Sequence, residues 1–125
     1  MIVRTWHGIV PIAKAEGFKK YIDQTGVEEV ISLPGNLGVC LHTQTQNEYE
    51  HFFMVSYWEG YEAIKAFAGP DYHIAVTYPE DALYELISDP IVLHHEVKEI
   101  SSQFPMNNPG YLINSNKREE STHGT

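Results

Sequence analysis

The chain has few basic residues and no cluster of them. Eight lysines and arginines stand against seventeen aspartates and glutamates, and the formal net charge is −9. Nucleic-acid binding needs Lys and Arg gathered on one phosphate-facing surface. The only adjacent basic pairs are Lys19-Lys20 and Lys117-Arg118. The composition therefore excludes nucleic acid as a partner.

Cysteine and long hydrophobic runs are equally scarce. No run of about 18 apolar residues is present that would span a membrane, and no basic-then-apolar signal segment opens the chain. Cys40 is the single cysteine, so no internal disulfide framework exists. We expect a cytoplasmic protein that contacts no membrane. We interpret Cys40 as a small core residue, with a nucleophilic role as the alternative.

Several sequence motifs that bind cofactors or metals are missing. The chain has no glycine-rich dinucleotide loop, no phosphate loop, no paired-Cys metal site and no metalloprotease helix. We therefore expect neither a resident metal nor an organic cofactor. A length of 125 residues accommodates one domain with a hydrophobic core and is too short for two.

The segment Tyr49–Gly69 is the most informative part of the chain. Tyr49–Trp58 reads as a strand, and alternate residues of a strand point to opposite sides of the sheet. Both sides are apolar here: Phe52, Met54 and Trp58 share one face, and Phe53, Val55 and Tyr57 share the other. Helices of the same chain can cover one face. The second face then needs another copy of the chain, which predicts a homodimer.

Periodicity and turn residues predict six elements, in the order strand, helix, strand, strand, helix, strand. This order is the ferredoxin-like βαββαβ arrangement, an α+β fold with a four-stranded antiparallel sheet and helices on one face. We expect one domain at residues 1–100 and a polar tail at 101–125, either disordered or packed on a partner subunit. The elements are expected at Ile2–Val10, 11–26, Leu37–Gln44, Tyr49–Trp58, Gly60–Ala68 and Ile91–Ile100.

This pattern resembles the antibiotic-biosynthesis-monooxygenase-like superfamily of dimeric α+β barrels. The resemblance covers residues 1–100, and its sequence marks are Trp58-Glu59, the Ala63/Phe67 spacing and His95-Glu96-Val97. It implies paired sheets and, in each subunit, a cavity between sheet and helices. Some members are cofactor-free monooxygenases that use O2 on polycyclic phenols, whereas others degrade haem, isomerise small molecules or have no known activity.

Haem degradation is disfavoured by two departures from the pattern of the haem-degrading members. Those members use an Asn on the first strand and a Trp on the second helix. The first strand here has no Asn, and Phe67 stands at the position of the Trp. His73 lies in the general region of the axial His, but the match around it is poor.

Seven histidines invite a role in proton transfer, because His titrates near neutral pH. The resemblance implies that the strand face carrying Thr5 and His7 looks into the cavity. His7 or His73 is our candidate for the base that deprotonates a phenol, and the alternative for each is a hydrogen-bonded or exposed structural His. Arg4 and Trp6 share the opposite face of the strand, so Arg4 is expected to pair across the dimer interface rather than to pin an oxyanion.

Hairpin geometry predicts that two histidines face each other. If Gln46-Asn47 forms the tip, residues whose numbers sum to 93 face each other, which places His42 opposite His51. Two imidazoles there would hold a metal only with a third ligand. The favoured interpretation is a polar patch near an exposed hairpin end.

Aromatic residues are frequent enough to line a cavity for a flat ligand. The expected substrate contacts are Thr5, Trp58, Phe67, Tyr72 and Tyr78. The favoured function is a cofactor-independent monooxygenase that acts on an aromatic or quinol-type small molecule. The alternatives are a haem- or small-ligand-binding dimer without turnover, and a structural or regulatory dimer.

Overall fold

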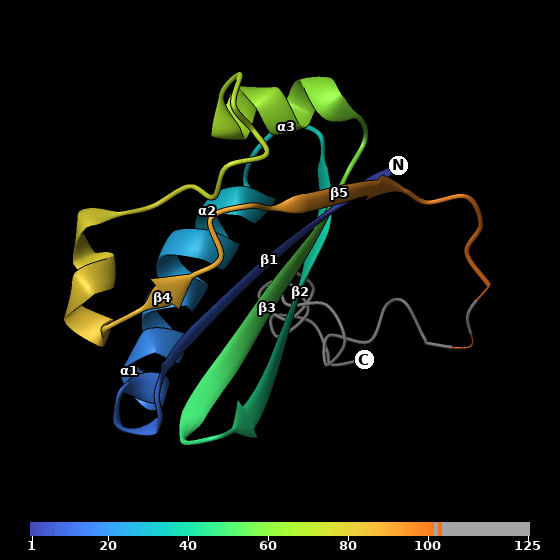
Figure 1. Ribbon diagram of the computed structural model, residues 1–125. Helices are drawn as coiled ribbons and strands as arrows, with labels where there is room; N and C mark the ends of the chain where they lie inside the picture. The colour runs from blue at the N-terminus through green and yellow to red at the C-terminus, as the bar shows by residue number, and fades with distance from the viewer. Residues whose placement is uncertain (102, 104–125) are drawn as a thin grey trace, which may run out of the picture.

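The computed structural model describes residues 1–101 and 103 (Figure 1). Predictions about the tail at 102 and 104–125 lie outside the described residues. The elements in chain order are β1 (Ile2–Pro11), α1 (Ile12–Ile22), the π-helical turn η1 (Asp23–Val27), α2 (Glu28–Ile31), β2 (Asn36–Gln46), β3 (Tyr49–Trp58), α3 (Tyr61–Ala68), the 3-10 helix η2 (Pro79–Tyr84), β4 (Ile87–Ser88) and β5 (Leu93–Glu96).

The strands form one antiparallel sheet in the order β2-β3-β1-β4, and β5 also pairs with β1. This arrangement confirms the ferredoxin-like α+β fold class. The final strand differs from the prediction for Ile91–Ile100, because it is split into β4 and β5 on the same edge of β1. Pro90 lies between the two pieces, and a proline has no N–H to donate to a sheet.

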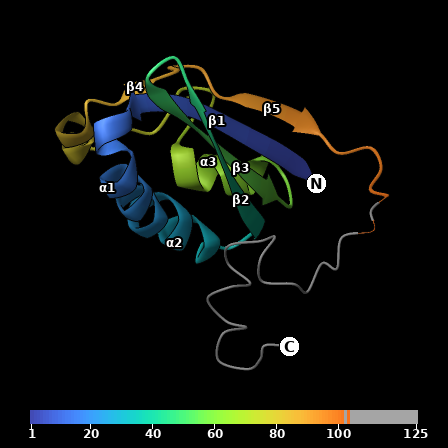
Figure 2. The same cartoon turned by 90° about the horizontal axis from the view of Figure 1, so that it is seen from below.

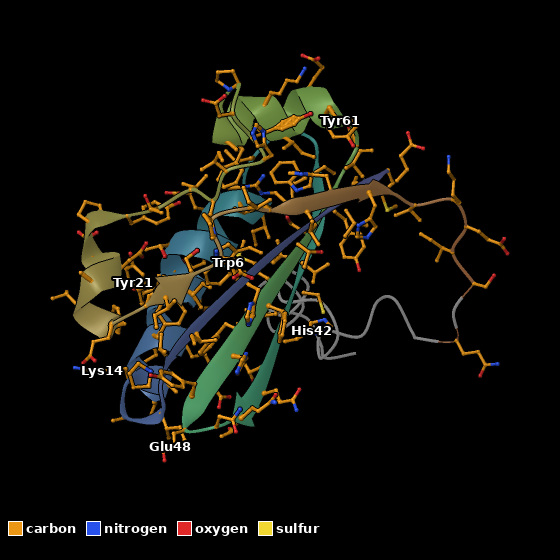
Figure 3. The ribbon with its side chains drawn as sticks, in the orientation of Figure 1. Trp6, Lys14, Tyr21, His42, Glu48 and Tyr61 are labelled. Atoms are coloured by element: carbon orange, nitrogen blue, oxygen red, sulfur yellow. The ribbon has the colours of Figure 1, made fainter. Side chains whose placement is uncertain are left out.

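The β2–β3 hairpin turns one residue later than predicted. Asn47 and Glu48 have φ of 55° and 66°, as a two-residue type I′ turn requires, and Glu48 lies at the tip (Figure 3). Gln46 therefore pairs with Tyr49, so paired residue numbers sum to 95. His42 faces Phe53 rather than His51, and the predicted His42–His51 pair is wrong.

The first helix also continues beyond its predicted end at Gly26. It passes through η1 into α2, and α1 and α2 lie along one face of the sheet (Figure 2). A Cβ at position 26 would lie 3.1 Å from Met54 Sδ and 3.1 Å from Ile22 Cγ1. Gly26 therefore serves a close approach of helix to sheet, not a helix stop.

The predicted alternation of β3 is confirmed. Phe52 and Trp58 are 1% and 0% exposed and belong to the core between sheet and helices. Phe53, Val55 and Tyr57 are half-buried on the other face, along which α1 and α2 do not lie (Figure 2). Among the described residues, no helix has the length and apolar character needed to cross a membrane.

Candidate functional site

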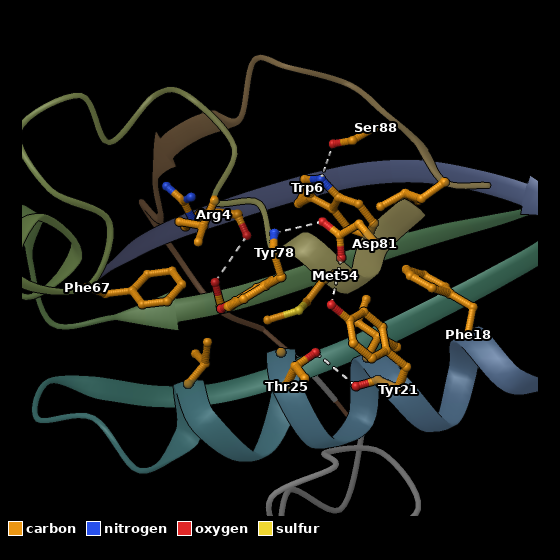
Figure 4. Close-up of a pocket in the computed structure, with 16 residues that line it drawn as sticks. Arg4, Trp6, Phe18, Tyr21, Thr25, Met54, Phe67, Tyr78, Asp81 and Ser88 are labelled. Carbon is orange, nitrogen blue, oxygen red and sulfur yellow. Dashed lines mark hydrogen bonds between the residues drawn. The ribbon is translucent and has the colours of Figure 1, made fainter. Parts of the chain in front are cut away.

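A cavity of about 80 Å³ lies between the inner face of the sheet and the helical layer (Figure 4). Phe18, Tyr21 and Thr25 enter it from the helix, and Tyr78 and Asp81 lie between the two layers. Aromatic and apolar side chains make most of its wall. The lining residues are Arg4, Trp6, Phe18, Tyr21, Ile22, Thr25, Gly26, Val30, Met54, Ser56, Phe67, Val76, Tyr78, Asp81, Leu86 and Ser88.

Trp6 forms the wall on the sheet side and is held in one orientation. Its Nε1–H donates to Ser88 Oγ at 2.8 Å, and its ring packs 6.5 Å from the ring of Phe18. The neighbouring Gly8 leaves room for the indole, because a Cβ there would lie 2.5 Å from Trp6 Cζ2. The position of this aromatic wall therefore depends on a glycine and a serine.

Tyr21 and Asp81 form the polar pair of the cavity. The Tyr21 hydroxyl donates to Asp81 Oδ1 at 2.8 Å, and the Tyr78 N–H donates to Asp81 Oδ2 at 2.9 Å. Burial, and then the hydrogen bond to Asp81, raise the pKa of Tyr21. Tyr21 therefore keeps its proton at neutral pH and orients the carboxylate, which is the natural proton acceptor of the pair.

Arg4 borders the cavity near Phe67 (Figure 4) and is 5% exposed. Its Nη1 donates to the Tyr72 carbonyl at 2.6 Å and to His94 Nε2 at 3.0 Å, and its guanidinium lies 5.5 Å from the ring centre of Phe67. Burial lowers the pKa of Arg4 to about 10, so it stays charged at neutral pH. Because Arg has no acceptor atom, His94 Nε2 accepts this bond and is unprotonated.

His94 makes the stability of the fold depend on pH. Burial, and then the charge of Arg4, lower its pKa from 6.5 to about 4. Between pH 6.5 and 4 the unfolded chain binds a proton that the folded chain does not, so stability falls as pH falls through this window. We expect a loss of about 2 kcal/mol, discounted for the partial exposure of the ring. Chemical denaturation at pH 7.5, 6, 5 and 4 measures it.

Two variants isolate the contribution of His94. His94→Gln keeps an acceptor for Arg4 and removes the titrating group, so its stability should fall less over this pH window. His95→Gln, at the exposed neighbouring position, should follow the wild-type curve. A wild-type slope in His94→Gln would show that other groups cause the acid loss.

The cavity contains two of the residues expected as substrate contacts, Phe67 and Tyr78. Trp58 lies behind Phe67, where it is 0% exposed and stacks on that ring at 5.7 Å. Tyr72 stacks on Tyr61 at 5.6 Å and supplies its carbonyl to Arg4. Trp58 and Tyr72 therefore support the wall from outside the lining.

The structure corrects the expected facing of β1. Trp6 is paired with Met54 on the inner face, whereas Thr5 and His7 are paired with Val55 and Phe53. Thr5 and His7 thus lie on the outer face, away from the cavity. The physical reason is the register with β3, whose inner face is fixed by the buried Phe52 and Trp58.

The candidate bases His7 and His73 both lie outside the cavity lining. His7 Nδ1 is 2.9 Å from Asp89 Oδ2, its Nε2 is 3.0 Å from His51 Nδ1, and its ring stacks on Phe53 at 4.6 Å. His73 is exposed, and its carbonyl accepts from the Val92 N–H at 2.8 Å. Neither imidazole is positioned to contact a ligand in the cavity.

Trp6, Tyr21 and Asp81 line the cavity although none of them was predicted as a site residue. Asp81 lies in the first turn of η2, where an acid is favoured without any ligand. Tyr21 recurs at helical spacing with Phe18 and Ile22, a pattern typical of a core-facing side of a helix. The inward-facing residues of β3 could have identified Trp6, because a residue paired with Met54 or Trp58 points to the same face of the sheet.

The described residues hold no group of three or more His, Cys, Asp or Glu that could bind a metal ion. His42, on β2 in Figure 3, has Nε2 3.2 Å from Cys40 Sγ. His51 instead contacts His7. The two histidines of the predicted pair therefore have different partners.

Solved structures show what the chain is similar to. A candidate antibiotic biosynthesis monooxygenase from Deinococcus radiodurans has a TM-score of 0.61 at 12% identity, with 82% of this chain and 97% of that chain covered. The haem degrader MhuD from Mycobacterium tuberculosis, solved with two haems in its active site, gives 0.56 and 23%, covering 82% and 100%. A dimeric ferredoxin-like protein from an uncultured marine organism gives 0.54 and 15%, covering 82% and 100%.

No protein-family model and no curated protein sequence matches the chain. The likeness to antibiotic-biosynthesis-monooxygenase-like and ferredoxin-like proteins is therefore a likeness of fold. Fold alone does not determine activity, so function has to be argued from the cavity.

Proposed function

We propose that the chain is a cofactor-independent monooxygenase of small phenols, which react in the cavity between sheet and helices. The observation that carries the proposal is the combination of aromatic walls with one hydrogen-bonded carboxylate, Asp81. The aromatic walls hold a flat ring, and the carboxylate accepts its phenolic proton. Solved neighbours with this fold include candidate antibiotic biosynthesis monooxygenases.

The reaction balances without an external reductant. A phenol with a free para position plus O2 gives a para-quinone plus water. The substrate loses its O–H proton and one ring hydrogen, one oxygen atom becomes the new carbonyl, and the other leaves as water. All four electrons come from the substrate. The protein needs only to bind the phenol, remove its proton and exclude bulk water.

The side chains divide these tasks. The Tyr21 hydroxyl donates to Asp81 and keeps a lone pair for the phenol O–H, so a proton can pass toward the carboxylate. Phe67 bounds the ring near Arg4, and Trp6 bounds it farther along the cavity (Figure 4). A volume of about 80 Å³ is below the ~150 Å³ that holds benzene elsewhere. One ring therefore fits only after a side chain moves, and Met54 is the flexible one.

Haem fits this cavity poorly. The lining contains no histidine or cysteine, the ligands that most often hold haem iron through nitrogen or sulfur. A macrocycle is also much larger than a ring that already requires Met54 to move. Haem therefore has no part in the proposed reaction.

We also propose that the working form is a homodimer joined through the outer face of the sheet. This face carries half-buried Phe53, Val55 and Tyr57, and a solved neighbour of the same fold is a dimeric ferredoxin-like protein. A second copy would remove these side chains from water, at about 25 cal/mol for each Å² of apolar surface.

Oxygen uptake with a panel of single-ring phenols that have a free para position tests the activity. We expect uptake with quinone formation by the metal-stripped protein, and a fall of about 100-fold in Asp81→Asn, because a positioned base contributes about that factor. Asp89→Asn is the matched control. It removes a carboxylate that contacts His7 on the outer face, and it should keep the wild-type rate.

Three outcomes would contradict parts of this proposal. Uptake no faster than the uncatalysed rate with every compound would count against monooxygenase activity. Full activity in Asp81→Asn would exclude Asp81 as the base. A loss in Asp89→Asn instead would move the reaction to the His7 side of the sheet.

A further inference from the structure

Arg4 is the only charged side chain among the described residues that is buried, at 5% exposure. A buried charge is costly unless it is paired and hydrogen-bonded. In the described part of the chain the ion pairs involve His7–Asp89, Lys14–Glu85, Lys65–Glu62 and Lys98–Glu96, and none involves Arg4. The guanidinium therefore has no carboxylate to balance its charge there.

The two acceptors that Arg4 does have are both neutral. One is the Tyr72 carbonyl, and the other is the unprotonated Nε2 of His94. Both bonds leave from Nη1, and a guanidinium carries five N–H donors. The ring of Phe67 offers its negative face at 5.5 Å, which eases the burial of the cation without neutralising it.

Arg4 lies at one end of the cavity already described, with Phe67 beside it, and Trp6 and Asp81 lie farther along (Figure 4). The lining of this one space thus includes a cation beside Phe67 and, farther along, a carboxylate with its tyrosine. A ligand that satisfies both carries an anionic group for the first and an O–H for the second. A carboxylate matches the fork of a guanidinium better than other small anions do, because it accepts two parallel N–H bonds.

We propose that Arg4 binds a carboxylate of the ligand, so that the substrate class is a single-ring phenol bearing a carboxyl group. This rests on the proposed function for the identity of the ring, but the anion site can be tested without turnover. Removal of water from the Arg4–carboxylate pair on binding strengthens the interaction relative to solution.

The test compares 3-hydroxybenzoate with 3-hydroxybenzamide, which have nearly the same shape and differ in charge. Binding is followed anaerobically by calorimetry, and by tryptophan fluorescence, to which Trp6 in the cavity lining and the buried Trp58 both contribute. We expect the wild type to bind the carboxylate at least about tenfold more tightly than the amide, as expected for a desolvated charged pair. Arg4→Met should reduce this preference to less than about twofold, and Arg4→Lys should keep part of it.

Lys65→Met is the matched control for general positive potential. Lys65 lies at the same end of the molecule, 5.9 Å from the ring centre of Tyr72, but it is exposed and outside the lining. It should keep the wild-type preference. Equal binding of the two probes by the wild type, or an undiminished preference in Arg4→Met, would overturn the anion site. An equal loss in Lys65→Met would show that the charge of the whole region, not Arg4, selects the carboxylate.

Failure of the anion site and failure of the proposed function give different results. A carboxylate preference without oxygen uptake leaves a binding site for an acidic phenol and removes the monooxygenase. Uptake from neutral phenols with no carboxylate preference keeps the monooxygenase and removes the role of Arg4. If Arg4→Met does not fold, the anion site is still tested by the binding of the two probes to the wild type and to Arg4→Lys.

Discussion

Gly8→Ala is expected to abolish most ligand binding in the cavity while leaving the fold in place. An alanine Cβ at position 8 would lie 2.5 Å from Trp6 Cζ2, 2.7 Å from Trp6 Cη2 and 3.0 Å from Leu86 Cδ1. Contacts this short force the indole to move. Because the Trp6 Nε1–H donates to Ser88 at 2.8 Å, a displaced ring loses that bond and enters the space a ligand would occupy.

The effect on function should exceed the effect on stability. Overpacking a core typically costs about 1–3 kcal/mol, whereas a displacement of about 1 Å at a reacting group can cost about 100-fold in rate. We expect a fall of that order in phenol uptake and at least about tenfold in 3-hydroxybenzoate affinity. Oxygen consumption, calorimetry and denaturant unfolding measure the three quantities separately.

Gly60→Ala is the control for the glycine change itself. Gly60 precedes α3 with φ of −176°, an extended conformation open to any residue, and a Cβ there meets no atom within 4 Å. It should bind and react like the wild type. If Gly8→Ala binds 3-hydroxybenzoate normally, Trp6 does not form a wall of the ligand site.

The fold could be predicted from sequence because both faces of β3 carry apolar side chains that must be removed from water. Phe52 and Trp58 must pack against helices, and Phe53 with Tyr57 must lie on the opposite side. Element order then selects the ferredoxin-like sheet. The register of β2 against β3 was harder to predict. The positive φ angles fall on Asn47 and Glu48 rather than on Gln46 and Asn47. This one-residue shift of the turn changes the partner of His42 from His51 to Phe53.

The site was predicted less well, for a related reason. Every residue of β1 from Arg4 to His7 is chemically plausible in a cavity. Composition alone therefore does not show whether Arg4 and Trp6 or Thr5 and His7 face inward. The pairing of Trp6 with Met54 decides it. Histidine count was a misleading guide, because His7 and His51 contact each other on the outer face, whereas the polar pair in the cavity lining is Tyr21 and Asp81.

Helix ends caused the remaining error. Gly26 is a common type of helix stop, yet here the helical path continues through η1, and the missing Cβ at position 26 leaves room for a close approach to Met54 across the layers. That contact is tertiary, and local sequence does not encode it. The same approach brings Thr25 and Tyr21 over the sheet, and it therefore positions the polar pair of the cavity.

Phe53→Asp is expected to convert the proposed dimer into a monomer. Phe53 lies at the centre of the outer face, paired with His7 on one side and His42 on the other. Burial of a carboxylate in the interface and the loss of an aromatic contact should together weaken association by at least about 100-fold. The monomer should tolerate the change, because an aspartate at 53 would lie beside His7 and exposed to water. Light scattering coupled to size exclusion measures the mass.

Leu83→Asp distinguishes the sheet face from the exposed apolar side chain of η2. Leu83 lies on η2 and is 67% exposed, so its replacement removes an apolar side chain of similar size far from β3. We expect it to remain dimeric. A monomeric Leu83→Asp together with a dimeric Phe53→Asp would place the interface at η2. The outer face would then be solvated, and its half-buried aromatic residues would need another explanation than a second copy of the chain.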